Sequence, residues 1–187
     1  MVRKWHPRPI THRLCAAWWL AALGCQAVPA LAQSSNPESL KAEVVYRLLM
    51  FVNWPPEREA NERQIQFCIA GDGHFEYALQ TLAGRNIRQF TISVRRLIRP
   101  DGSAGCHVLY LPAPKSALSL LPTDGSTLVI SDAAGMLEHG AMINLQVEDG
   151  RIVFDVDLDA ARRANLTIST KLLRLARFVR HQQGGGP

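Results

Sequence analysis

The sequence predicts an α/β fold, in which a three-layer, doubly wound and mostly parallel sheet carries a C-terminal antiparallel hairpin and flanking helices. Between residues 37 and 140, short apolar runs alternate with helical segments, which is the pattern of parallel strands joined by crossover helices. Two runs of alternating apolar and polar residues then flank Asp149-Gly150, a pair preferred in two-residue hairpins. Beyond its first 32 residues the chain is long enough for one domain with a buried core.

The first 32 residues have the pattern of a secretory signal peptide. Four cations without an acid precede an apolar run of about 15 residues, and Ala30-Leu31-Ala32 forms an A-x-A cleavage site. The apolar run is too short for a membrane-spanning helix. We therefore expect cleavage after Ala32, a single periplasmic domain over residues 33–180 and a disordered tail over residues 181–187. The alternative is lipidation at Cys25, but Ala22 then stands where a lipoprotein signal usually has Leu.

The charge balance excludes a nucleic-acid-binding function. The whole chain has 21 Lys and Arg against 16 Asp and Glu, a formal charge of +5. Four of the basic residues and none of the acidic ones lie in the predicted signal peptide, so the mature chain has a balance of about +1. No basic field is left to attract a polyanion.

The first half of the predicted domain contains two helices and two strands. Residues 37–52 have one broad apolar face at helical spacing, and Pro55 and Pro56 end this helix because the residue before a proline is disfavoured in the α region. Strands are predicted at residues 63–71 and 90–97, with a helix at residues 72–84 between them.

The second half adds two strands, the hairpin and further helices. Strands are predicted at residues 106–112 and 127–132, with a short helix at 114–121 between them. Asp132 is placed to cap a helix at 133–140, and the hairpin follows over residues 141–159. Two helices, at residues 159–166 and 167–181, complete the domain.

Two of the four cysteines, Cys68 and Cys106, lie beyond the predicted signal peptide. In a doubly wound order the first strand is central and the next two flank it, so these cysteines fall on neighbouring strands. They form either a disulfide, if their Cα atoms approach within about 7 Å, or two buried thiols. An oxidising compartment favours the disulfide.

A crevice at the carboxyl ends of the parallel strands predicts an alternative function, the binding of a small ligand. The residues expected there are Gly71, Asp72, His74 and Asp132. The turn at Gly71 and Gly73 also resembles part of a dinucleotide-binding loop, but Glu76 replaces the third glycine and would bring a negative charge to the pyrophosphate. An ordinary turn is therefore favoured.

No residue pattern indicates catalysis, so we expect no enzyme, no cofactor and no metal. The expected strand positions of Asp155, Asp157 and Asp159 favour a solvated strand face over a calcium or acid–base site. A nucleophile elbow, a C-x-x-C motif and an S-x-x-K motif are all missing. The histidines beyond residue 32 have no ligand spacing; they are His74, His107, His139 and His181.

The predicted last helix has an apolar face and a basic one. Cations in its final turns complement the helix dipole, which favours a solvated face over a surface for an anionic partner. The inward positions are Ile168, Leu172, Leu175, Ala176 and Val179, and the cations are Lys171, Arg174, Arg177 and Arg180.

Several segments together resemble the YfiR family of periplasmic regulators. They are AEVVYRLLMFVNWP, IQFCIAGD, GCHVLYLP, TLVISDAAGM and the run from Gly140 to Arg177, and they cover nearly all of residues 40–180. The most specific parts are the aromatic-Val-x-Trp-Pro end of the first helix and the late run. Leu48 and Leu49 stand where relatives often carry Phe, the late motif reads Ile-Ser-Thr at 168–170, and no second cysteine pair lies near the hairpin.

This resemblance implies a periplasmic repressor. Members of the family bind the periplasmic domain of an inner-membrane diguanylate cyclase of the YfiN type and hold it inactive, which lowers cyclic di-GMP. An outer-membrane lipoprotein of the YfiB type sequesters the repressor. The resemblance also implies a homodimer and a redox-sensitive disulfide between Cys68 and Cys106.

Two alternative roles are expected for the Trp54 side chain. The two prolines after it would hold its loop rigid and present the indole at low entropic cost as an interaction anchor, or Trp54 packs into the core. The resemblance favours a partner-binding edge formed by Phe51, Trp54 and Pro55.

Overall fold

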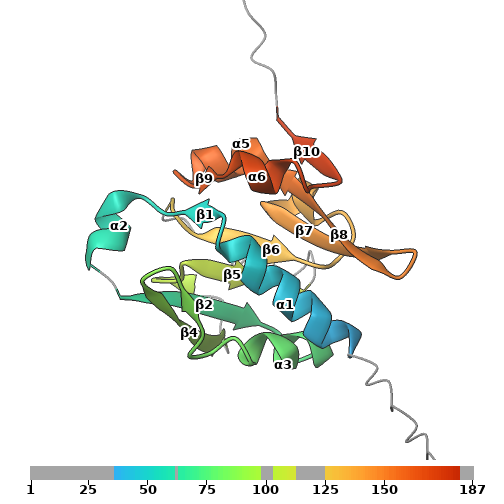
Figure 1. Ribbon diagram of the computed structural model, residues 1–187, viewed down its shortest axis with the longest axis horizontal. Coiled ribbons are helices and arrows are strands. Elements are labelled where there is room, and N and C mark those ends of the chain that lie inside the picture. The colour runs from blue at the N-terminus through green and yellow to red at the C-terminus, as the bar shows by residue number, and fades with distance from the viewer. Residues whose placement is uncertain (1–35, 62, 98–102, 113–124, 182–187) are drawn as a thin grey trace, which may run out of the picture. The chain divides into compact units, whose positions relative to one another are not determined.

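The computed structural model describes residues 36–61, 63–97, 103–112 and 125–181, and within them the predicted fold class is confirmed. Helices flank a mostly parallel sheet (Figure 1). Its eight strands follow the order β10-β8-β7-β6-β5-β2-β4-β3, and only β8–β7 and β4–β3 pair antiparallel. β1 and β9 form a separate antiparallel pair.

The described strands are β1 (Val52–Asn53), β2 (Gln64–Ala70), β3 (Asn86–Ile87), β4 (Phe90–Leu97), β5 (Val108–Tyr110), β6 (Leu128–Ser131), β7 (Ile143–Glu148), β8 (Arg151–Asp157), β9 (Thr167–Ile168) and β10 (Phe178–Arg180). The described helices are α1 (Pro37–Leu49), α2 (Pro56–Asn61), α3 (His74–Gln80), the 3-10 helix η2 (Met136–His139), α5 (Leu158–Arg163) and α6 (Thr170–Leu173).

β2 lies between β4 and β5, as the doubly wound order predicts. It pairs parallel with both neighbours, and its residues from Phe67 to Ala70 are all buried. A strand covered on both faces has no reason to alternate polar and apolar residues, which explains its continuous apolar run.

The first helix forms for the local reasons that its sequence predicts. The Asn36 side chain accepts a hydrogen bond from the backbone N–H of Glu38 at 3.0 Å, and Pro37 occupies the first turn. α1 crosses the sheet in Figure 1 and buries Ala42, Val45 and Leu49. It ends at Leu49, three residues earlier than predicted, and Met50 is its C-cap. The chain then extends into β1, where Val52 pairs with Ile168, so the expectation that Pro55 and Pro56 end this helix is wrong.

The hairpin around Asp149-Gly150 is confirmed. β7 and β8 pair from Ile143↔Val156 to Glu148↔Arg151. Both turn residues have positive φ, 49° for Asp149 and 72° for Gly150, as a two-residue turn matched to the strand twist requires.

The predicted C-terminal helix is wrong. Only α6 is helical, with the Ser169 side chain as its cap, and the chain then forms β10 parallel to β8, with Phe178 opposite Asp155. Leu175, expected inward, is 69% exposed. The helical spacing was outweighed by two carboxylates on β8 that draw the late arginines onto the sheet.

The helix expected at 133–140 is also wrong. The structure has only the four-residue η2 there, and left-handed Gly135 precedes it without a side-chain cap. The predicted helix at 114–121, the signal peptide and the tail beyond His181 lie outside the described residues.

Candidate functional site

Cys68 and Cys106 form a disulfide. Cys68 is in β2 and Cys106 lies two residues before the adjacent β5, and their Cα atoms are 5.8 Å apart. Both residues are fully buried. The bridge therefore ties the central strand to its neighbour inside the core.

Arg95 of β4 lies against this disulfide from the other side of β2. It is opposite Cys68 in the strand register, and its Nη2 atom is 3.6 Å from Cys68 Sγ and 3.5 Å from Cys106 Sγ. The same atom donates to the carbonyl of Ala104 at 2.9 Å. A guanidinium at this distance would favour the thiolate form of either cysteine after reduction.

Trp54 is a core residue, so its expected exposure as an anchor is wrong. It is 4% exposed, and its indole Nε1 donates to the carbonyl of His107 at 3.1 Å. Phe51 and Pro55 beside it are half-buried. The partner-binding role of the edge formed by Phe51, Trp54 and Pro55 stays a prediction, with Trp54 as its support rather than its contact.

The junction between Cys106 and His107 connects the disulfide to this edge. The carbonyl of Cys106 accepts hydrogen bonds from Arg58 of α2 at 2.9 Å and from the Thr127 hydroxyl at 2.7 Å. The next carbonyl, of His107, holds the Trp54 indole. The disulfide therefore lies next to the two carbonyl groups that accept hydrogen bonds from α2 and from Trp54.

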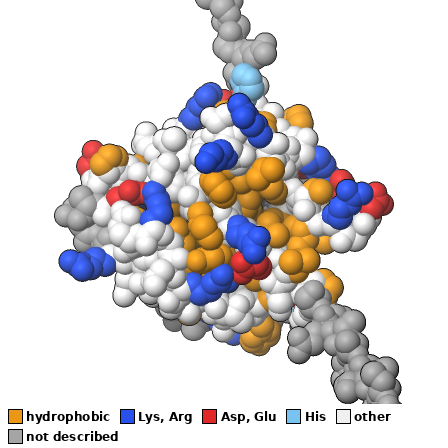
Figure 2. All heavy atoms as spheres, viewed as in Figure 1, with side chains coloured by type: hydrophobic (Ala, Val, Ile, Leu, Met, Phe, Trp, Pro, Cys, Tyr) orange, Lys and Arg blue, Asp and Glu red, His pale blue; other side chains and the backbone are white. Residues whose placement is uncertain are grey.

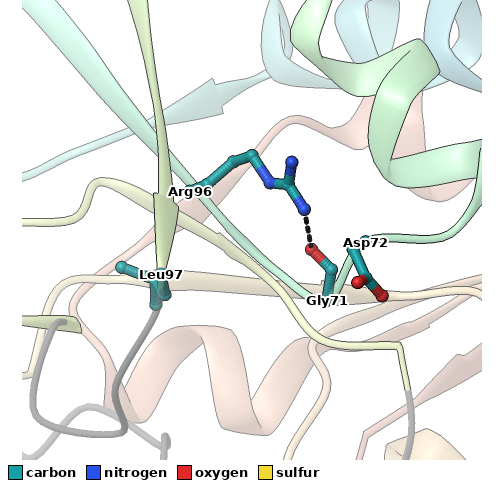
Figure 3. A pocket seen from close by; sticks show the side chains of 4 residues that line it. All are labelled: Gly71, Asp72, Arg96 and Leu97. Atoms are coloured by element: carbon teal, nitrogen blue, oxygen red, sulfur yellow. Dashed lines mark hydrogen bonds between the residues drawn. The ribbon is translucent and has the colours of Figure 1, made fainter.

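The predicted ligand crevice is only partly assembled. Gly71 and Asp72 line an open hollow of about 480 Å³ at the carboxyl ends of β2 and β4, together with Arg96 and Leu97 (Figure 3). Arg96 Nη2 donates to the Gly71 carbonyl at 3.3 Å. His74 is exposed at the start of α3, and neither it nor Asp132 lines this hollow.

Asp132 belongs instead to a half-buried ion-pair network. Its carboxylate accepts from Lys41 Nζ at 2.8 Å and from the Tyr110 hydroxyl at 2.6 Å, which is why it does not cap a helix. Lys41 Nζ also lies 2.7 Å from Glu38 Oε2 and 4.3 Å from the centre of the Phe75 ring. Nothing in the spacing of Lys41 on its helix distinguished it from a solvated cation.

Two side chains of this network, Tyr110 and Lys41, have shifted pKa values. Burial, reinforced by the Asp132 carboxylate, raises the pKa of Tyr110 far above its ordinary value, so the phenol stays a donor. Burial by itself would lower the pKa of Lys41, but its bonds to Asp132 and Glu38 raise it overall. Neither of these two side chains is therefore available as a general base at neutral pH.

The turn after β2 is shaped around Glu76. A Cβ atom at Gly71 would come 2.8 Å from Glu76 Oε1, and one at Gly73 would come 2.7 Å from Glu76 Oε2. The buried carboxylate thus occupies the space under the turn where a dinucleotide-binding loop would receive phosphate.

Asp155 and Asp157 are buried, at 6% and 4% exposure, so the expected solvated strand face is wrong. Arg177 Nε donates to Asp155 Oδ1 at 2.9 Å, and Arg180 Nη1 lies 3.5 Å from Asp157 Oδ2. Arg177 also pairs with Glu148, and Arg180 with Glu138. These pairs fasten β10 to the hairpin and to η2.

Among the described residues, no group of three or more His, Cys, Asp or Glu side chains could hold a metal ion. No helix in the same part of the chain is long and apolar enough to cross a membrane.

Comparison with known families decides the class of the protein. The profile of the YfiR/HmsC-like family matches residues 38–177. The chain belongs to this family. The YfiR/HmsC-like match includes both bridge cysteines, the Trp54 edge and the hairpin, which agrees with the resemblance found in the sequence.

Two solved structures are distantly similar. A conserved domain protein from Vibrio cholerae O1 biovar El Tor has a TM-score of 0.49 and 12% identity, over 77% of this chain and 60% of that one. The ABC domain in complex with L-Trp from Streptococcus pneumonia has a TM-score of 0.47 and 10% identity, over 78% of this chain and 61% of that one. The chain thus spans about 60% of the length of each.

Membership of the YfiR/HmsC-like family gives the general class of function. The family is periplasmic, generally lacks enzymatic activity and acts in regulation of cyclic di-GMP signalling. The disulfide between Cys68 and Cys106 suits a protein of that compartment.

Proposed function

We propose that this domain is a periplasmic repressor, which binds the periplasmic domain of an inner-membrane diguanylate cyclase and so lowers cyclic di-GMP. The observation that carries the proposal is the family match over residues 38–177. The half-buried network at Lys41, Tyr110 and Asp132 supports the proposal, because its polar groups form hydrogen bonds with one another and do not point toward a substrate site.

The surface of the domain offers a place for such a partner. Figure 2 shows hydrophobic side chains over the centre of the viewed face, interrupted by basic and acidic ones. α1 crosses the sheet on this face in Figure 1. Leu40 of α1 is 47% exposed, and Val44 of α1 and Leu173 of α6 are partly exposed. Apolar side chains exposed on one face of an exported domain favour protein binding.

The mechanism is a shift in the cyclase's conformational equilibrium. A repressor that binds the inactive conformation more tightly than the active one lowers the active fraction, and sequestration of the repressor by a YfiB-type outer-membrane lipoprotein restores it. The repressor acts as a homodimer. Reduction of the disulfide releases the Cys106–His107 junction that supports Trp54 and Arg58, and repression weakens.

Cyclic di-GMP measured in cells tests this proposal. Deleting the gene should raise cyclic di-GMP, and the wild-type chain should restore the low level. Leu40→Glu places a charge on the apolar face at an already exposed position and should fail to restore the low level. Tyr77→Glu, at a position on α3 that is 55% exposed against 47% for Leu40, should restore it. An unchanged level after deletion contradicts the proposal.

A second candidate function is the binding of a small ligand in the hollow lined by Gly71, Asp72, Arg96 and Leu97. Its volume of about 480 Å³ lies within the range of known ligand pockets. Thermal-shift measurements across metabolite pools test this candidate function. A saturable rise in melting temperature that Arg96→Ala removes supports it, and the absence of any rise contradicts it.

A further inference from the structure

Arg95 of β4 contacts both sulfur atoms of the Cys68–Cys106 disulfide. Its Nη2 atom lies 3.5 Å from Cys106 Sγ and 3.6 Å from Cys68 Sγ, so the two sulfur atoms are almost equally close to the positive charge. Both cysteines are fully buried, whereas Arg95 is exposed. The sulfur atoms carry no charge while they are bonded to each other, but a cysteine thiolate is stabilised by a neighbouring arginine. The position of Arg95 therefore matters most for the reduced state.

Two anchors that do not involve the sulfur atoms hold this guanidinium in place. The backbone of Arg95 is opposite Cys68 in the parallel ladder that joins β2 and β4 along their whole length. The Nη2 atom also donates to the carbonyl of Ala104 at 2.9 Å, two residues before Cys106. Neither anchor needs the S–S bond. We therefore expect the positive charge to stay beside the cysteines after reduction.

Two other titratable side chains lie beside the bridge, those of Arg58 and His107. Arg58 Nη2 of α2 donates to the backbone carbonyl of Cys106 at 2.9 Å. His107 Nδ1 accepts a hydrogen bond from the backbone N–H of Gln66 at 3.1 Å, so this nitrogen has no proton and the imidazole is uncharged. Arg58 and Arg95 thus add positive charge at the bridge, and Arg95 places its charge at the sulfur atoms themselves.

A reducing dithiol opens such a bridge in two exchange steps. A thiolate of the reductant attacks one sulfur atom, the S–S bond breaks, and the other sulfur atom leaves with the bonding electron pair as a thiolate. The second thiolate of the reductant then attacks the mixed disulfide, which releases the second cysteine and leaves the reductant as a disulfide. Two electrons have entered the bridge, and each new thiolate either stays charged or takes a proton from water.

We infer that Arg95 stabilises the reduced state of this bridge and so makes the disulfide easier to reduce than it would be without the arginine. Its nearly equal distances to the two sulfur atoms let it stabilise whichever sulfur leaves as the thiolate. Stabilisation of the reduced form is what makes a disulfide a stronger oxidant. Arg95 is a positioning residue, because it acts through the cysteines and not on the reductant. The inference does not rest on cyclase repression, since the reduction equilibrium is a property of the isolated chain.

The test is an equilibrium redox titration of the purified exported chain in mixtures of reduced and oxidised dithiothreitol. Alkylation and mass measurement give the reduced fraction. Arg95→Met removes the charge and should lower the equilibrium constant for reduction about tenfold at about pH 8.5, which is about 30 mV for this two-electron couple. The difference from the wild type should nearly vanish at about pH 6, because few thiolates form there. A purely structural effect of the substitution would be the same at both pH values.

Two further variants separate the charge from the packing of the side chain. Arg95→Lys keeps a cation near the sulfur atoms and should recover most of the wild-type equilibrium constant. Arg63→Met, at an exposed position just before β2, is the matched control that removes the same charge and should leave the constant unchanged. The inference is overturned by an unchanged constant in Arg95→Met, a difference independent of pH, no recovery in Arg95→Lys, or an equal loss in Arg63→Met.

Discussion

Reduction of the Cys68–Cys106 disulfide should lower the free energy of unfolding by about 4 kcal/mol. The bridge closes a loop with a sequence separation of 38, and the chain-entropy relation gives that value for a loop of this length at 25 °C. For a domain of roughly 150 residues, each kcal/mol moves the melting temperature by about 2–4 °C. We therefore expect a fall of roughly 8–16 °C on reduction.

The assay is thermal and urea unfolding of the exported chain with and without dithiothreitol, with alkylation and mass measurement to show that both thiols are free. Trp54 is the only tryptophan beyond residue 32, and its indole bonds the carbonyl next to Cys106, so its fluorescence reports directly on the junction. A Cys68→Ala/Cys106→Ala variant controls for other effects of the reductant and should not respond. An unchanged melting temperature in fully reduced protein would refute both the stabilisation and the proposed link from the bridge to Trp54.

Three further predictions concern the core and its ion pairs. Trp54→Ala should lower the free energy of unfolding by about 3–5 kcal/mol. Trp54→Phe keeps most of the packing and loses the hydrogen bond to His107, so it should lower that free energy by about 0.5–1.5 kcal/mol. Equal and negligible losses in urea unfolding would contradict the buried position of Trp54. Arg177→Gln leaves the buried Asp155 without its main partner and should lower the free energy of unfolding by about 1–3 kcal/mol. Arg174→Gln, at an exposed position of the same segment, should change it by less than about 0.5 kcal/mol. Similar values for the two variants would contradict the pairing of β10 with β8. The free energy of unfolding should fall as the pH rises above about 10, because Tyr110 ionises in the unfolded chain near its ordinary pKa of 10.0 but stays protonated in the folded one. Lys41, whose pKa is raised from 10.5 in the folded chain, changes the stability in the same direction. A Tyr110→Phe variant with an equally steep loss of stability at alkaline pH would contradict this prediction.

The central sheet could be predicted because its signals are local and mutually consistent. The apolar run of β2, the alternation of β7 and β8 and the turn pair Asp149-Gly150 each need only a few neighbouring residues to be recognised. The strand order placed Cys68 and Cys106 on neighbouring strands, since β2 lies between β4 and β5, and the oxidising compartment favoured the disulfide over two buried thiols.

The errors lie where partners distant in the chain decide the structure. Arg177 and Arg180 fit a helix by spacing, but the buried carboxylates on β8 need cations and draw this segment into a strand. The position of Asp132 predicts a helix cap, but its carboxylate instead accepts a hydrogen bond from Lys41, which lies 91 positions earlier in the chain. The burial of Asn144, which is 1% exposed, had no signal in the sequence, because an asparagine on an alternating strand resembles any solvated residue.

Site-specific photo-crosslinking from position 40 in living cells tests the central claim most directly. A photoreactive amino acid replaces Leu40 on the apolar face, and a second strain carries it at Tyr77 as the control. Capture of a membrane diguanylate cyclase from position 40 and not from position 77 is the result that cyclase repression through this face predicts. Capture of no membrane protein from position 40, in cells where the chain lowers cyclic di-GMP, would contradict it.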